Sequence, residues 1–149
     1  MRCYNKGSVS ANNSVGGIIG VAMTALMAGS STYYYSETMY CYNIGSLSAT
    51  ASSPSIGGIA ATLNTTSNTV SNNYWDTDCG ATYAIASASS NAGATSYSNL
   101  DSTTYAKNSS WALYTGYWDF SNVWVIKSGY NDGYPTFVYA LPKKTITFN

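Results

Sequence analysis

Charge is what this sequence most lacks. Only 8% of its 149 residues are Asp, Glu, Lys or Arg, against about 25% in ordinary soluble domains. Basic and acidic residues number 6 each, so the formal net charge is zero. Nucleic-acid binding depends on clustered Lys and Arg side chains that neutralise phosphates. The composition therefore argues against a nucleic-acid partner.

Histidine is absent, and the three cysteines, Cys3, Cys41 and Cys79, form no metal-binding pattern. Acid–base catalysis is thus left to carboxylates, of which only Asp76 and Asp78 form a close pair in the sequence. Such a pair can hydrolyse a glycosidic bond, but near a repeat start its simpler role is to form a turn. We expect no enzyme and no catalytic residue; a β-helix glycosidase or lyase is the enzyme alternative.

The same two acids open a string that has the D-x-D-x-G form of a calcium loop, residues 76–80. The twelfth position of that loop is Ser87, so the bidentate Glu of an EF-hand is missing. Asp76 and Asp78 are therefore candidate calcium ligands, with a plain turn as the preferred interpretation. No other cofactor is expected.

The apolar run at residues 15–29 is too short to cross a membrane, because a spanning helix needs about 20 apolar residues. Arg2 and Lys6 precede the run, so it mimics the charged start and apolar core of a signal peptide. Residues around it recur later in the chain, which favours a structural role. We expect no membrane insertion by this segment.

Tyrosine, serine, threonine, asparagine and glycine dominate what is present. The chain has 15 Tyr beside 4 Trp and 3 Phe. Tyrosine tolerates half-burial because its ring packs while its hydroxyl group stays in water. A composition with few strong helix formers favours strands and turns. Because 45% of the residues are hydrophobic, we predict a folded all-β protein and not a disordered chain.

A nine-residue block occurs twice. Residues 3–11, CYNKGSVSA, return as residues 41–49, CYNIGSLSA, and each copy is followed by a Gly-Gly-Ile segment. A degenerate third start lies at residues 72–75. Stacked copies would pair each strand with its equivalent about 4.8 Å away, which predicts a parallel β-helix-like β-solenoid. The expected structural positions are Cys3, Tyr4, Asn5, Gly7, Val9, Gly16, Gly17, Cys41, Tyr42, Asn43, Gly45, Leu47, Gly57 and Gly58.

Stacking predicts that equivalent residues of the two blocks lie above one another, with Asn side chains bonding to each other along the stack. Cys3 would then lie under Cys41. In-register neighbours point their side chains the same way, which suits a disulfide poorly, so reduced thiols are preferred and a disulfide is the alternative. The Gly-Gly steps allow either a positive φ or a tight corner.

The pattern CYN-x-GS-x-S followed by Gly-Gly-Ile resembles the GLUG-motif repeats of large bacterial surface and secreted proteins. The strings at residues 73–77, 116–120, 124–126 and 133–135 are similar to the segment that closes such arrays. The resemblance implies an extracellular, non-catalytic structural or adhesive module, at the cell surface or secreted. Its partners would be neighbouring repeats, identical copies, or a glycan or protein of a host or neighbouring cell.

We expect one domain over residues 1–141, a stack closed by a C-terminal β-hairpin cap. Residues 142–149 contain a linker and then resemble the first strand of an internalin-type B-repeat, so they would begin a following surface repeat. The chain thus looks like part of a longer surface protein.

The cap is expected as strands at residues 123–127 and 136–141, joined by the Asn-Asp-Gly turn at 131–133. The Ala- and Ser-rich segment at 83–96 reads as a loop, and a capping box predicts a short helix over about 99–107. The bulk of the cap's core is expected from Trp111, Trp118 and Trp124.

The aromatic candidates for ligand contact are Tyr33, Tyr34, Tyr35 and Trp75. Successive side chains of a strand point to opposite faces, and we do not expect both faces to be equally buried here, so at least one of the three tyrosine rings should be exposed. Exposed Tyr and Trp rings stack on sugars and on protein partners. These residues support the alternative function, a carbohydrate-binding module.

Overall fold

The structure is a computed structural model that describes residues 2–22, 25–26, 33–34, 37–63, 69–87, 94–97, 106–112 and 114–142. Throughout these ranges the regular structure consists of β-strands and short 3-10 helices, so the predicted all-β class is confirmed. None of the described helices is long and apolar enough to cross a membrane.

The chain divides into two compact units, Met1–Leu100 and Asp101–Asn149, here called the first and second units. The domain expected over residues 1–141 spans the first unit and most of the second. Residues 143–149, which include the expected start of a following repeat, lie outside the described residues.

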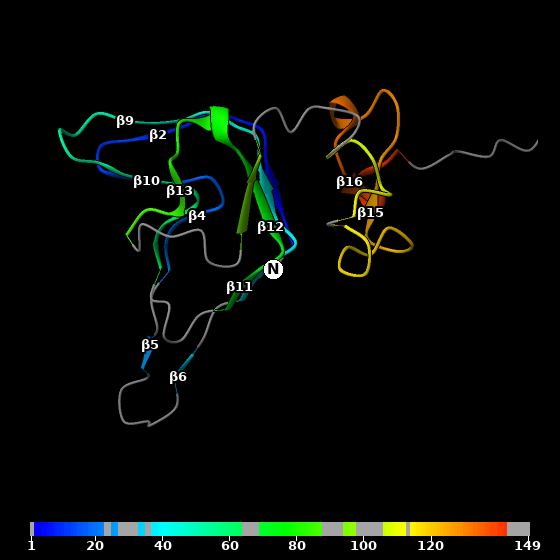
Figure 1. The fold of residues 1–149 in the computed structure, drawn as a ribbon, viewed down its shortest axis with the longest axis horizontal. Helices are drawn as coiled ribbons and strands as arrows, with labels where there is room; N and C mark the ends of the chain where they lie inside the picture. The colour runs from blue at the N-terminus through cyan, green and yellow to red at the C-terminus, as the bar shows by residue number, and fades with distance from the viewer. Residues whose placement is uncertain are drawn as a thin grey trace, which may run out of the picture. The chain divides into compact units, whose positions relative to one another are not determined.

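The starts of the repeats form one parallel sheet in the first unit (Figure 1). Its strands, in spatial order, are β1 (Tyr4–Asn5), β8 (Tyr42–Asn43), β12 (Asn73–Asp76) and β14 (Ala94–Tyr97). Tyr42 pairs with Tyr4 on one side and with Tyr74 on the other. The two blocks and the degenerate third start therefore lie in register.

The rest of each block pairs in the same way. Strand β2 (Val9–Ala11) lies parallel to β9 (Leu47–Ala49), with Val9 opposite Leu47. Leu47 belongs to the buried core, and Val9 packs against that core. The two aliphatic positions therefore share one interior, as the repeat predicts.

The Gly-Gly-Ile segments also lie side by side. Strand β10 (Ser55–Leu63) pairs in parallel with β3 (Ser14–Gly16) and β4 (Ile19–Ala22) of the first copy, and with β13 (Tyr83–Ile85). Figure 1 shows β4, β10 and β13 running together. The run that mimics a signal peptide thus contributes two paired strands of the repeat.

Two smaller pairings accompany these sheets. Strand β7 (Glu37–Met39) lies parallel to β11 (Thr69–Ser71), and each leads into the next repeat start. Strand β5 (Ala25–Leu26) is antiparallel to β6 (Tyr33–Tyr34). The parallel pair continues the register of the repeats, and the antiparallel pair belongs to the insertion that follows the first Gly-Gly-Ile segment.

The loop expected over residues 83–96 is a wrong prediction, because β13 lies within it and β14 begins within it. Ala84 and Ile85 have no exposed surface and pair with β10. Small and aliphatic side chains fit an already crowded interior, so an Ala-rich composition does not exclude a buried strand here. Residues 99–105 of the expected short helix lie outside the described residues.

The second unit contains the predicted hairpin. Strand β15 (Trp124–Val125) is antiparallel to β16 (Thr136–Phe137), with the 3-10 helix η2 (Asn131–Gly133) between them and η3 (Val138–Ala140) after them. The strands are shorter than the sequence indicated, and η3 begins directly where β16 ends. A cap role for this hairpin stays a prediction.

Aromatic rings fill the core of the second unit. The expected core residues Trp111, Trp118 and Trp124 are all buried. The ring of Trp124 lies 4.6 Å from that of Trp118 and 4.4 Å from that of Phe137, measured between centroids. Tyr114 joins them and donates a hydrogen bond from its hydroxyl group to a backbone carbonyl. This unit is held by ring packing where the first is held by strand pairing.

Candidate functional site

The first candidate site is the stack that the starts of the two blocks form. The rings of Tyr4 and Tyr42 are stacked with centroids 5.2 Å apart and planes at 7°. Tyr42 is almost completely buried and Tyr4 is half-buried. This ring pair confirms that equivalent side chains lie above one another.

The asparagines form the predicted side-chain ladder. Asn5 donates from Nδ2 to Oδ1 of Asn43 over 2.9 Å. Each Asn side chain also closes the turn that follows it in the chain. Its Oδ1 accepts from the backbone N–H of the glycine two residues later, and its Nδ2 donates to the carbonyl of the same glycine, which is Gly7 for Asn5 and Gly45 for Asn43. One side chain therefore shapes its own turn and also joins the next copy.

Close approach requires glycine at the second of these turns, at Gly45, whereas a Cβ on Gly7 would make only ordinary contact with its own turn. A Cβ on Gly45 would overlap the carbonyl oxygen of Gly7 in the copy below. Glycine brings its backbone nearer to a neighbour than any other residue allows. The turn can therefore stack on its equivalent only while this position stays glycine.

The Gly-Gly steps work as tight corners and not through a positive φ, since none of the four glycines is among the described residues of positive φ. A Cβ on the first glycine of each step would overlap a carbonyl oxygen three residues later, that of Ile19 for Gly16 and that of Ala60 for Gly57. The corner alternative is therefore the correct one.

The second glycine of each step leaves room for a side chain of the next copy. A Cβ on Gly17 would overlap the side chain of Asn43, and a Cβ on Gly58 would overlap the indole ring of Trp75. Asn43 and Trp75 are themselves register partners on adjacent strands. Successive copies thus place a different side chain over the same glycine position.

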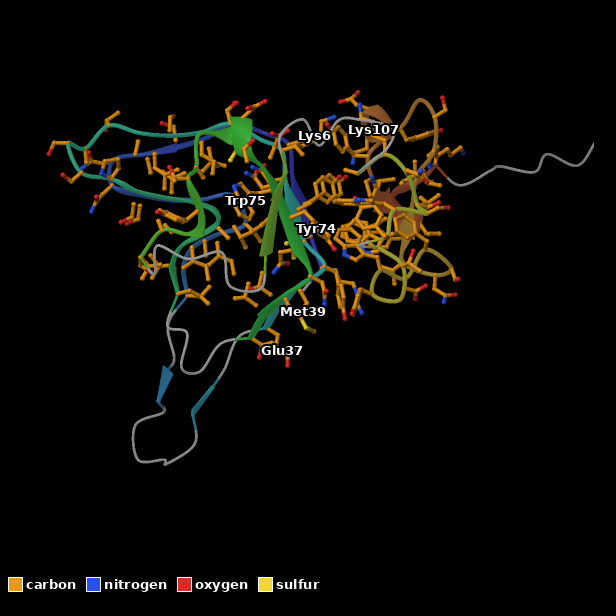
Figure 2. The ribbon with its side chains drawn as sticks, in the orientation of Figure 1. Lys6, Glu37, Met39, Tyr74, Trp75 and Lys107 are labelled. Atoms are coloured by element: carbon orange, nitrogen blue, oxygen red, sulfur yellow. The ribbon has the colours of Figure 1, made fainter. Side chains whose placement is uncertain are left out.

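The prediction that Trp75 offers an exposed ring for ligand contact is wrong. Its side chain has no exposed surface, because strand alternation turns it into the space above Gly58. Figure 2 shows Trp75 and Tyr74 leaving β12 on opposite sides. Of the three candidate tyrosines, Tyr33 and Tyr34 lie on β6, and Tyr35 lies outside the described residues.

Asp76 and Asp78 form a turn, which is the interpretation that the sequence favours for this pair. Asp76 precedes the 3-10 helix η1 (Thr77–Cys79), and its Oδ1 accepts a hydrogen bond from the backbone N–H of Asp78 over 3.0 Å. Within the described ranges, no three His, Cys, Asp or Glu side chains come together as metal ligands. Calcium binding by Asp76 and Asp78 stays a prediction that the structure does not test.

The cysteines are reduced, and two of them touch. The sulfur atoms of Cys3 and Cys41 lie 3.3 Å apart, with the thiol of Cys3 donating to Cys41 and the thiol of Cys41 donating to the carbonyl of Met39. The hydrogen bond with Cys41 lowers the pKa of the Cys3 thiol, whereas the bond with Cys3 and burial raise that of Cys41. Cys79 is buried, which raises its pKa.

Sequence reasoning missed two corner residues and one buried asparagine. Tyr40 and Asn72 precede equivalent strands, and both take the left-handed conformation, with φ of 58° and 52°. Asn73 is fully buried; its side chain accepts from the amide of Cys41 and donates to the carbonyl of Thr38. Asn72 is a sequence signal for its corner, since Asn adopts the left-handed conformation more readily than most residues; Tyr40 carries no such signal.

A surface cleft on the first unit is the other candidate site. Its volume is about 320 Å³, and the ring of Tyr83, which is 39% exposed, forms part of its wall. Its other lining residues include Pro54, Ser55, Ile56 and Thr82. Nothing in the sequence indicated this cleft, because Tyr83 falls in the segment that reads as a loop.

Comparison of the chain with protein-family models, with curated proteins and with solved structures gives no significant match. The resemblance to GLUG-motif repeats and to an internalin-type B-repeat therefore stays a prediction that rests on the residues quoted for it.

Proposed function

We propose that this chain is a non-catalytic structural or adhesive module of a larger bacterial surface protein, exposed outside the cell and built as a β-solenoid of GLUG-type repeats. The observation that carries the proposal is the in-register pairing of consecutive copies. Strands β1, β2 and β3–β4 each lie parallel to the equivalent strand of the second copy. Stacked copies of this kind form a stiff, elongated support.

The use of the stacked side chains supports a structural role. The side chains of Asn5 and Asn43 form hydrogen bonds with the turns that follow them and with each other. The rings of Tyr4 and Tyr42 pack on each other. Groups committed to neighbours in this way hold the copies together and do not form a reaction centre.

Location is tested with antibodies raised against the purified chain. Intact cells of the source bacterium should be labelled, and protease added outside the cells should remove the label. Labelling only after the envelope is permeabilised would refute an extracellular module. A cytoplasmic protein of the same cells, probed in parallel, controls for leakage.

The stacked arrangement is tested by amide hydrogen exchange. The amides of Tyr42 and Tyr74 donate to carbonyls of the preceding copy, Cys3 and Cys41, so both should exchange slowly and together. The amide of Asp78, bonded only to the side chain of Asp76 in an exposed turn, is the fast-exchanging control. Fast exchange at Tyr42 and Tyr74 would exclude stacked copies.

One observation favours the second candidate function, carbohydrate binding: the cleft that Tyr83 borders. The lining residues named above carry no charge, and they combine a ring with the hydroxyl groups of Ser55 and Thr82, which suits a neutral sugar. A glycan array with the parent, Tyr83→Ala and the control Tyr117→Ala tests this function. Binding lost only in Tyr83→Ala supports it; no binding by the parent dismisses it.

A further inference from the structure

We infer that Cys3 and Cys41 form a redox site, in which an external disulfide oxidises the two thiols to a bond between consecutive copies. Their sulfur atoms already lie 3.3 Å apart, and a disulfide needs about 2.05 Å. The inference goes beyond the structural role proposed above and does not depend on it.

The backbone holds the two residues at a suitable separation. The amide of Tyr42 donates to the carbonyl of Cys3 over 3.2 Å, and the pairing of Tyr4 with Tyr42 fixes the register beside it. Parallel neighbours lie about 4.8 Å apart, within the range of roughly 4.4–6.8 Å between Cα atoms that disulfides span. Bond formation therefore needs side-chain rotation and a small backbone adjustment, not a new register.

The two thiols differ in the way that a two-step exchange requires. Cys3 is half-buried, whereas Cys41 has no exposed surface. The hydrogen bond with Cys41 lowers the pKa of the Cys3 thiol, and thiolate is the attacking form. Cys3 is therefore the residue that meets an external reagent, and Cys41 is the residue that resolves the product.

The reaction balances as a thiol–disulfide exchange. The Cys3 thiolate attacks a small external disulfide, forming a mixed disulfide and releasing one thiolate. The thiol of Cys41 then loses its proton to solvent, attacks Sγ of Cys3 and releases the second thiolate. The protein pair loses two electrons, and the external disulfide gains them. Cys79, buried at the end of η1, takes no part.

The experiment treats the full chain with oxidised glutathione and then counts free thiols after unfolding. The expected result is one free thiol, at Cys79, and a cross-linked peptide pair containing Cys3 and Cys41 by mass spectrometry. Dithiothreitol should restore all three thiols. Three free thiols after oxidation, or a bond that includes Cys79, would overturn the inference.

Two variants guard against misreading the count. Cys79→Ala should still form the bond and leave no free thiol, and Cys3→Ser should leave Cys41 unreactive until the chain unfolds. The bond would join residues that are 38 positions apart in the sequence and would lower the entropy of the unfolded chain. The Tm of the oxidised parent should therefore be about 10 °C higher than that of the reduced parent. An unchanged Tm would contradict a bond made without distortion, and dimers in place of the internal bond would overturn the site.

Discussion

The two nine-residue blocks have almost the same sequence but unequal surroundings. In the second block Cys41, Tyr42 and Asn43 are buried, whereas Tyr4 and Asn5 in the first block are only half-buried. The second block has a paired strand on each side, β1 and β12, while the described partner of β1 is β8 alone. Burial in this protein thus depends on a residue's place in the stack more than on its identity.

We expect the largest difference in stability between the two blocks from substitution of their stacked tyrosines. Tyr42→Ala removes a ring that is 1% exposed and should cost about 3–5 kcal/mol, as for other buried aromatic rings. Tyr4→Ala removes a half-buried ring and should cost about 1–2 kcal/mol. Urea unfolding of both variants measures the difference. Equal losses would mean that both blocks are equally enclosed in solution.

The aliphatic pair on β2 and β9 should show the same ordering with a smaller span. Leu47→Ala opens a cavity in the core and should cost about 3 kcal/mol, and Val9→Ala at the core's margin should cost about 1 kcal/mol. Ser48→Ala, an exposed change on β9, is the matched control and should be near neutral. A larger loss from Val9→Ala would reverse the assignment of the enclosed copy.

The asparagine ladder comes next. Asn43→Ala leaves the buried backbone groups of Gly45 without their partner and should cost about 2 kcal/mol. Asn5→Ala affects Gly7, whose exposed groups can bond to water, and should cost about 1 kcal/mol. Thermal unfolding of the two variants beside the parent checks both values. Equal decreases in Tm for Asn43→Ala and Asn5→Ala would show that the turn at Gly45 is accessible to water.

The smallest effect concerns the reduced thiols. The pKa of Cys3 is lowered and that of Cys41 is raised, so the Cys3 thiolate persists as the pH falls below the ordinary value of about 8.5, where a free thiol protonates. Labelling by iodoacetamide, followed by mass spectrometry, should therefore slow less with falling pH at Cys3 than in an unfolded control peptide. Labelling of Cys41 in the folded chain would contradict its burial.

The register of the repeats could be predicted from the sequence because identity at seven of nine positions leaves one way to superpose the copies. The ladder of Asn5 and Asn43 follows from that register. The burial of Trp75 could not be predicted, since its register partner is the much smaller Asn43. Strand β13 was missed because the Ala- and Ser-rich segment that contains it reads as a loop, whereas pairing with β10 makes Tyr83–Ile85 a strand.

The division into two units was also beyond the sequence. The aromatic motifs of residues 116–126 resemble a closing segment, and that resemblance merged them with the repeats into one domain. The structure gives these rings a core of their own around Trp118 and Trp124. The single domain over residues 1–141 stays a prediction.

The second glycine of each Gly-Gly step lies against a side chain of the next copy, and this limits where a repeat can be inserted or removed. Gly17 accommodates Asn43, and Gly58 accommodates Trp75, so each fitted pair straddles the border between two copies as they are written in the sequence. The unit to insert, delete or graft as a repeat therefore begins at one of these glycines and ends just before the next, and it does not start where the visible motif starts.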